Sequence, residues 1–529
     1  MLKTTQLDKL LKDKSISRRE FIRRSSLLGA ASVAPGLFIP TAASASPKKG
    51  GHFKFGMGAG STTDALDPAH FTDGYMQTVG GAIYNLLVEI NNNNEPIPEL
   101  AESWESSPDA RIWTIKLRKG VQFHNGKTMT SADVIASIEH HRGEESKSAA
   151  KPLLIPIVSI KADGDNVVIF ELDGSNADFP FILSDYHLPV LSAENGVADV
   201  TTGNGTGGYV LDRFDPGIST SFTRNPNYWK EGRAHFDSAE IIAIIDVTAR
   251  TNAMTTGEIH AMDRCDLKTV HLLKRNKNLR ITQVNGNQHY TIPMHSDVAP
   301  FNDNNIRLAL KHAIDREALL ETVLRGYGAV GNDHPIGFAN RYHASDLEQR
   351  SYDPDKAKYY LKQAGLDSLK VDLSSSESAF SGAVDSAVLY KEHAAKAGID
   401  INVVREPNDG YWSDIWLKKP WCFSFWGGRP TEDLMFSTAY KTGADWNESH
   451  FSNAHFDDLL IQARAELDDE KRRGMYVEMQ QLVRDTGGAV IPMFASYVSA
   501  ASTKINQGEK IASNMDNDGV RCIERWSFA

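Results

Sequence analysis

The sequence predicts an α/β protein with mixed sheets that folds into more than one lobe. Segments with the two-residue alternation of strands and segments with the apolar spacing of helices follow each other along the chain. The chain has 529 residues. A single hydrophobic core stops growing at about 250 to 300 residues, so two or three lobes are expected. Lobes that meet form clefts, and clefts are where proteins bind small ligands.

Composition excludes several functional classes. Hydrophobic residues make up 41% of the chain and charged residues 24%, which is ordinary for a folded protein and argues against disorder. Lys and Arg number 57 against 68 Asp and Glu, a formal net charge of −11. Nucleic acid is therefore not an expected partner. The motifs of common hydrolases, G-x-S-x-G and H-E-x-x-H, do not occur in the sequence.

The first 45 residues form a basic leader, with eight Lys and Arg against three Asp and Glu. Residues 17–23 (SRREFIR) resemble a twin-arginine export signal, and residues 27–40 form a weakly apolar segment too short to cross a bilayer. Residues 43–45 (ASA) have the small side chains of a cleavage site. We interpret 1–45 as a signal peptide, with the mature chain starting near Ser46 in the periplasm. The alternative is a basic cytoplasmic tail with a chance arginine pair.

Strand and helix patterns begin directly after this leader. Residues 50–57 alternate apolar and polar side chains, as a strand does, and residues 79–90 carry apolar side chains at helical spacing. Residues 91–96 (NNNNEP) are turn formers, which predict a hairpin connection. In residues 111–118 the alternation places Trp113, Ile115 and Leu117 on one face, as in a half-buried strand.

Helical patterns become more frequent further along the chain. Thr130 or Ser131 is the expected N-cap of a helix, and the Gly- and Thr-rich residues 204–209 indicate a lobe boundary near residue 204. Further helices are expected at residues 301–314, 316–324, 353–364, 456–467 and 471–483.

Several separated segments carry one family pattern. They are residues 98–104 (PELAESW), 117–126 (LRKGVQFHNG), 130–134 (TSADV), 205–209 (GTGGY), 224–229 (RNPNYW), 300–303 (PFND) with Arg307, and 313–316 (AIDR). Taken in order, these segments resemble the periplasmic solute-binding proteins of peptide-type ABC importers (extracellular solute-binding protein family 5), which also serve nickel and opine uptake. The resemblance extends over the whole mature chain.

The resemblance implies a three-lobe periplasmic-binding-protein type II fold with a central ligand cleft. Lobe I would comprise residues 46–88, 205–294 and 482–529, lobe II residues 89–204, and lobe III residues 295–481. Such a protein is a monomer that closes around its solute by hinge motion and delivers it to an inner-membrane permease, without chemistry on the solute. The alternatives are a periplasmic chaperone or sensory receptor that uses the same cleft, and an exported hydrolase.

Tryptophan is concentrated where the ligand is expected to bind. Four of the nine Trp residues fall within residues 412–426, and Trp combines large apolar contact with one donor. Such clusters either pack in a core or contact ligand. The candidate ligand contacts are Trp426, Gly427, Arg429, Asp433, Tyr75, Tyr290 and Trp446.

The family resemblance also exposes a departure in this segment. Peptide-binding members carry an aspartate there that pairs with the peptide's α-ammonium, whereas residues 426–430 read WGGRP, without that acid. Either Asp433 or another acid takes over the ammonium, or Arg429 binds a carboxylate and the solute is not an ordinary peptide. The expected solutes are a peptide, an opine or an amino-acid conjugate.

Neither a cofactor nor a protein-held metal is expected. His140 and His141 are adjacent, which is poor spacing for metal ligands. Nickel held in a small organic chelator stays open, since some members of the family bind metal in that form. Cys265, Cys422 and Cys522 are either three buried free thiols, the interpretation we favour, or one bridge and one thiol.

Overall fold

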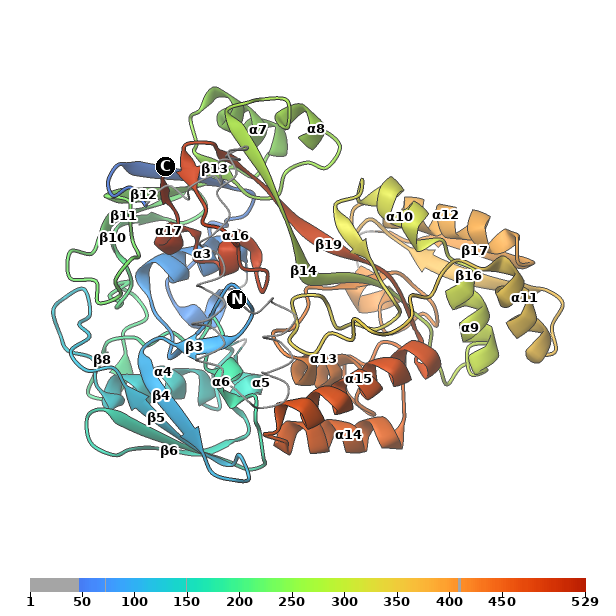
Figure 1. The fold of residues 1–529 in the computed structure, drawn as a ribbon, viewed down its shortest axis with the longest axis horizontal. Helices are drawn as coiled ribbons and strands as arrows, with labels where there is room; N and C mark the ends of the chain where they lie inside the picture. Colours follow the sequence, from blue (N-terminus) through green and yellow to red (C-terminus); the bar gives the residue numbers. More distant parts are fainter. Residues whose placement is uncertain (1–46, 72, 149, 408–410) are drawn as a thin grey trace, which may run out of the picture. The chain divides into compact units, whose positions relative to one another are not determined.

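The computed structural model describes residues 47–71, 73–148, 150–407 and 411–529, and the predicted leader lies outside these residues. The described residues belong to one compact unit. Its main sheet mixes parallel and antiparallel pairs, which confirms the predicted α/β class (Figure 1). Along the described chain, no helix combines the length and apolarity needed to cross a bilayer.

The main sheet has nine strands in the order β10-β11-β12-β1-β13-β19-β14-β18, with β15 paired to β19. These strands are β1 (His52–Met57), β10 (Tyr209–Asp215), β11 (Ser219–Arg224), β12 (Ser238–Ala243), β13 (Ala261–Met262), β14 (Leu279–Pro293), β15 (Gly328–Val330), β18 (Ser424–Trp426) and β19 (Ala489–Ser502). Strand β1 runs parallel to both of its neighbours. Strands β14 and β19 lie side by side as one long antiparallel pair (Figure 1).

A second, antiparallel sheet has four strands in the order β4-β5-β7-β6. Its strands are β4 (Ala101–Ser106), β5 (Ile112–Leu117), β6 (Ile157–Ala162) and β7 (Val167–Leu172). The remaining strands form two-stranded pairs: β2 (Val88–Ile90) with β3 (Pro96–Pro98), β8 (Ala193–Glu194) with β9 (Val197–Ala198), β16 (Leu369–Ser375) with β17 (Ile399–Arg405), and β20 (Ile505–Asn506) with β21 (Ser527–Phe528).

Helices pack on both parts of this framework. Before β14 they are α3 (Gly74–Ile83), α4 (Ser131–Arg142), α5 (Lys151–Leu154), α6 (Phe179–Ile182), α7 (Val247–Thr256) and α8 (Val270–Leu273), with a 3₁₀ turn at Pro68–His70. After β14 they are α9 (Asn304–His312), α10 (Arg316–Val323), α11 (Pro354–Gln363), α12 (Ala383–Ala395), α13 (Glu432–Ala439), α14 (Ala454–Ala465), α15 (Asp469–Thr486), α16 (Asp516–Gly519) and α17 (Cys522–Arg525).

Most of the predicted elements are confirmed, and one is wrong. Trp113, Ile115 and Leu117 are buried on one face of β5, and Thr130 caps α4 in a capping box with Asp133. The single helix expected over residues 79–90 is instead a helix and a strand, α3 and β2. Helix α3 begins early because the Asp73 carboxylate accepts hydrogen bonds from the first backbone amides, and it ends before β2 pairs with β3.

The buried side chains gather in several clusters rather than one core. One cluster packs residues 53–84 against β10 to β13 and the C-terminal segment, a second lies within residues 87–190, and a third lies within residues 290–495. The lobe boundaries given above stay predictions. Cys265, Cys422 and Cys522 are buried free thiols.

Buried histidines make the fold sensitive to acid. Burial lowers the pKa of five of them to about 3 or 4: His141, His289, His295, His312 and His334. An unfolded histidine has a pKa of about 6.5, so between about pH 4 and 6.5 the unfolded chain binds more protons than the folded chain. Each histidine therefore removes up to about 1.4 kcal/mol of stability per pH unit as the pH falls through this window.

We expect the urea midpoint to fall as the pH is lowered from about 7.5 to about 5. Ten histidines have a lowered pKa, whereas six carboxyl groups have a raised pKa and act in the opposite direction. Burial raises the pKa of Asp263 to about 6 and that of Glu432 to about 7, so both carboxyls favour folding as the pH falls. Urea titrations followed by circular dichroism measure the midpoint at the two pH values. A midpoint that rises on acidification would contradict the expected fall.

Candidate functional site

An open cavity of about 280 Å³ is lined by aromatic side chains and one arginine. The lining residues are Trp412, Trp416, Phe425, Trp426, Gly427, Arg429 and Trp446. Three of the aromatic side chains are unusually accessible, with exposed fractions of 41% for Trp412, 39% for Phe425 and 47% for Trp446. Apolar rings exposed together in one hollow mark a place where a ligand or partner binds.

The rings stand as walls around the cavity. The Trp412 ring is nearly perpendicular to the rings of Trp416 and Phe425, at 77° and 70°, with centroid distances of 5.7 and 5.6 Å. The Trp446 ring centroid lies 6.1 Å from those of Trp416 and Trp426. Such edge-to-face contacts are favourable in themselves, so the rings hold one another in place.

The backbone around the cavity places these rings. Trp426 and Phe425 belong to β18, which pairs with His289 and Tyr290 of β14. Trp412 lies in a π-helical turn, Tyr411–Ile415, and the Tyr411 hydroxyl donates to the Phe423 carbonyl at 2.7 Å. The turn is thereby tied to the residue directly before β18, the strand that carries Phe425 and Trp426.

A buried carboxylate, Glu448, orients two of the indoles. It accepts hydrogen bonds from the Trp416 Nε1 at 2.7 Å, from the Trp426 Nε1 at 3.0 Å and from the Thr291 hydroxyl at 2.6 Å. Burial raises the pKa of this carboxyl. The sequence did not indicate Glu448, because this residue lies beyond the Trp-rich segment. Its role depends on the fold, which brings Thr291 of β14 and the two indoles to the same carboxylate.

Arg429 places a cation in the cavity wall. Its guanidinium donates to the Gly428 carbonyl at 2.8 Å and lies 5.3 Å from the centroid of the Trp426 ring. Burial lowers the pKa of Arg429. Within the described residues, no carboxylate lies at ion-pair distance from this guanidinium. The protein thus holds a partly desolvated cation beside an aromatic wall without neutralising it directly.

Gly428 allows the backbone of residues 426–430 to pass close to β14. Its φ is +82°, a conformation that side chains rarely adopt. A Cβ atom added there would lie 2.4 Å from the Cβ of Asn287. The side chain of Asn340 also donates to the Arg429 carbonyl, at 3.2 Å. The close approach and this hydrogen bond fix the backbone of the segment.

The cavity contains four of the seven candidate contacts from the sequence: Trp426, Gly427, Arg429 and Trp446. The other three are engaged elsewhere. Asp433 accepts two hydrogen bonds from the Arg464 Nε, at 3.0 and 3.2 Å.

The two tyrosines among the candidates are packing residues in this structure. The Tyr290 ring stacks on Phe380, with centroids 3.8 Å apart. Tyr75 is fully buried, and its hydroxyl forms a hydrogen bond of 2.9 Å with that of Thr220. Neither lines the aromatic cavity.

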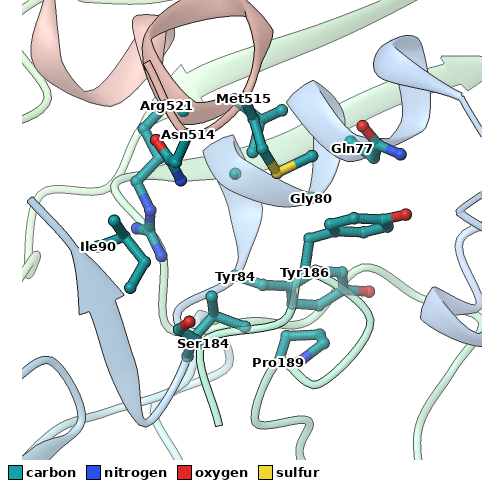
Figure 2. Close-up of a pocket in the computed structure, with 14 residues that line it drawn as sticks. Gln77, Gly80, Tyr84, Ile90, Ser184, Tyr186, Pro189, Asn514, Met515 and Arg521 are labelled. Carbon is teal, nitrogen blue, oxygen red and sulfur yellow. The ribbon is translucent and has the colours of Figure 1, made fainter. Parts of the chain in front are cut away.

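A second, more enclosed cavity of about 40 Å³ lies between α3, residues 184–189 and the C-terminal segment. Figure 2 shows Met515 reaching from this segment toward Tyr84 and Tyr186, with Gln77 to one side and Arg521 to the other. This volume is sufficient for ordered water. The buried Tyr84 hydroxyl and Asn514 Oδ1 have no hydrogen-bond partner in the described part of the chain.

The two cavities are linked electrostatically through Tyr186. Burial raises the pKa of Tyr186, and the charge of Arg429 counteracts that rise. In turn, Tyr186 and Asp185 counteract the lowering effect of burial on the pKa of Arg429. Asp185 and Tyr186 are therefore close enough to the arginine of the aromatic cavity to act on its charge. Across the described chain, no group of three or more His, Cys, Asp or Glu side chains is placed to hold a metal ion.

The fold identifies the class of protein to which the chain belongs. Residues 95–448 match the family model for bacterial extracellular solute-binding proteins, family 5 (middle). The chain belongs to this family. It is a solute-binding protein of the class that serves ABC importers, and the relatives it matches are binding proteins rather than enzymes.

Among curated proteins, the chain is 24% identical over 473 residues to the dipeptide-binding protein of Escherichia coli K12, covering 81% of this chain and 86% of that one. It is 27% identical over 384 residues to a probable peptide ABC transporter periplasmic-binding protein of Sinorhizobium fredii, covering 68% and 70%. Among solved structures, it is similar to DppA of Helicobacter pylori in complex with the peptide STSA, with 25% identity, a TM-score of 0.72 and coverage of 91% and 98%.

Proposed function

We propose that the chain captures a carboxylate-bearing small organic solute in the aromatic cavity and delivers it to an inner-membrane ABC permease. A peptide, an opine or an amino-acid conjugate has the required chemistry. The mature chain works as a periplasmic monomer, exported by the twin-arginine route. The observation that carries this proposal is Arg429, a partly buried guanidinium in the cavity wall with no carboxylate partner among the described residues.

Arg429 favours an anionic group for physical reasons. A guanidinium pairs with a carboxylate through two parallel hydrogen bonds, which are stronger than neutral ones. The partial burial of Arg429 removes water from the cation, and the protein provides no carboxylate in its place. A ligand carboxylate would replace the hydrogen bonds that the water made. The exposed rings of Trp412, Phe425 and Trp446 contact the apolar part of the same solute.

Solute capture by hinge closure is supported by contacts between the predicted lobes II and III. The Ala177 amide donates to the Arg464 carbonyl at 2.7 Å, and Asp178 forms an ion pair with Arg472 at 2.5 Å. Both side chains of the ion pair are almost fully buried, with exposed fractions of 5% and 7%. Removing one partner of such a pair leaves a buried charge unpaired, which disfavours the arrangement in which the pair forms.

We expect Asp178→Ala to favour the open form and to weaken solute binding by about three- to tenfold, because Arg472 then has no anion when the lobes close. Small-angle scattering with and without solute measures the open population, and calorimetry measures the affinity. The matched control is Asp355→Ala, whose exposed carboxylate pairs only with Lys358. If the Asp178→Ala variant closes around the solute and binds it as the unchanged chain does, the Asp178–Arg472 ion pair does not contribute to closure.

A thermal-shift screen of residues 46–529 tests the proposed function. The panel contains dipeptides and tripeptides, opines, sugars, small organic acids and nickel chelates. Binding to the folded state alone stabilises by about 2.7 kcal/mol at 100 times Kd, which is readily visible. Stabilisation by carboxylate-bearing compounds supports the proposal. Stabilisation by sugars alone would contradict it.

A further inference from the structure

The aromatic cavity has one charged residue in its lining, and that charge is positive. The acids of the same region have other partners: Asp433 pairs with Arg464, Asp185 with His187, and Glu448 with two indoles and Thr291. A solute carboxylate therefore finds a partner in Arg429. An ammonium group of the same solute finds no acidic side chain among the residues that line the cavity.

The ring faces provide the alternative partner for a cation. Aromatic faces, those of tryptophan above all, attract a cation within about 6 Å of the ring centroid. In this cavity the Trp426 face already lies 5.3 Å from the guanidinium carbon of Arg429. The indole N–H groups of Trp416 and Trp426 both donate to Glu448. The N–H donors of these two rings therefore already have a partner within the protein.

The lining also discriminates between kinds of ammonium. Its side chains are those of four tryptophans, a phenylalanine and an arginine, and none of these side chains carries an acceptor oxygen. A primary ammonium has three N–H donors, and burying them without acceptors costs free energy. A nitrogen whose hydrogens are replaced by alkyl groups avoids this cost and adds apolar contact with the rings.

We propose that the cavity selects a zwitterion whose N-alkylated ammonium group lies against the faces of Trp412, Trp416 and Trp446 while its carboxylate pairs with Arg429. This inference rests on the proposed function and specifies the substrate class of the same site. It also accounts for the absence of the family's ammonium-binding aspartate from residues 426–430, because cation–π contact takes the place of the ion pair.

Two isosteric compounds test this inference. Glycine betaine and 3,3-dimethylbutanoate have the same shape, and each carries one carboxylate. Betaine has a positively charged quaternary nitrogen where dimethylbutanoate has a neutral quaternary carbon. Calorimetric titration of residues 46–529 is expected to show betaine binding about tenfold more tightly, which corresponds to about 1.4 kcal/mol. Equal affinities, or tighter binding of dimethylbutanoate, would overturn the inference. So would the failure of both compounds to bind at up to about 10 mM.

A tryptophan variant distinguishes binding through cation–π contact from binding through simple apolar contact. Trp412→Leu keeps an apolar side chain and removes the ring, so betaine affinity is expected to fall about fivefold more than dimethylbutanoate affinity. Trp412 is 41% exposed, so the fold tolerates the change, which circular dichroism verifies. The matched control is Tyr359→Leu on α11, an aromatic residue with an exposed fraction of 56% outside the cavity. Equal losses for both compounds would contradict the cation–π contact.

The outcomes also distinguish this inference from the proposed function. If both compounds bind equally and Arg429→Ala abolishes the binding, the cavity still captures carboxylates and only the ammonium preference is wrong. If no carboxylate-bearing compound of the thermal-shift panel stabilises the chain, the proposed function itself fails.

Discussion

Replacing Arg429 by alanine is expected to weaken solute binding by about 1 to 3 kcal/mol, or about 5- to 150-fold. The guanidinium is the cation of the cavity wall, and its hydrogen bond to the Gly428 carbonyl leaves donors for a ligand carboxylate. The stability of the solute-free chain should change little, since the protein does not pair this cation with a buried carboxylate. Calorimetric titration with the most stabilising compound of the thermal-shift panel measures the loss.

Two further variants sharpen the interpretation. Arg429→Lys keeps the charge and loses the planar fork, so we expect an intermediate loss if the carboxylate is held by two parallel hydrogen bonds. Arg341→Ala removes an exposed arginine that pairs with Asp469, outside the cavity, and should leave the affinity unchanged. An Arg429→Ala variant that binds as tightly as the unchanged chain would remove this residue from the site.

The strands were predictable where one face is buried and the other is exposed. In β5 the alternation of Trp113, Ile115 and Leu117 with polar neighbours survives in the structure, because burial on one side imposes it. Helix α3 is apolar almost throughout and lies within the core, so its spacing does not separate it from the strand that follows. The helix boundary depends on Asp73 and on the β2–β3 pairing.

The site was predictable in part, and for a similar reason. The density of tryptophan in residues 412–426 identifies the segment, and the glycines beside Arg429 indicate a backbone that approaches another. The environment of Asp433 was not predictable, because its partner Arg464 lies on another helix. Sequence spacing gives no measure of such distances, which is also why neither the burial of Tyr75 nor the hydrogen bonds of Glu448 could be predicted.

Replacing Glu448 by glutamine is expected to destabilise the folded chain by about 1 to 3 kcal/mol and to weaken solute binding as well. The carboxylate accepts three hydrogen bonds, from Thr291, Trp416 and Trp426. An amide offers one oxygen and two N–H donors, so at least one of these donors then faces another donor inside the protein. The two indoles lose their common anchor, and the cavity wall they form becomes less well ordered. Urea unfolding followed by tryptophan fluorescence reports both effects.

The control for this change is Glu478→Gln, whose half-exposed carboxylate pairs with His455 on the surface. Its midpoint should match that of the unchanged chain, because exposed pairs contribute little. A Glu448→Gln variant with an unchanged midpoint would mean that the group is held as a neutral acid, for which glutamine is a close substitute. In that case binding should also be unaffected, and the indoles would owe their positions to ring packing. A lowered midpoint together with weakened binding would instead establish Glu448 as the residue that positions the aromatic wall.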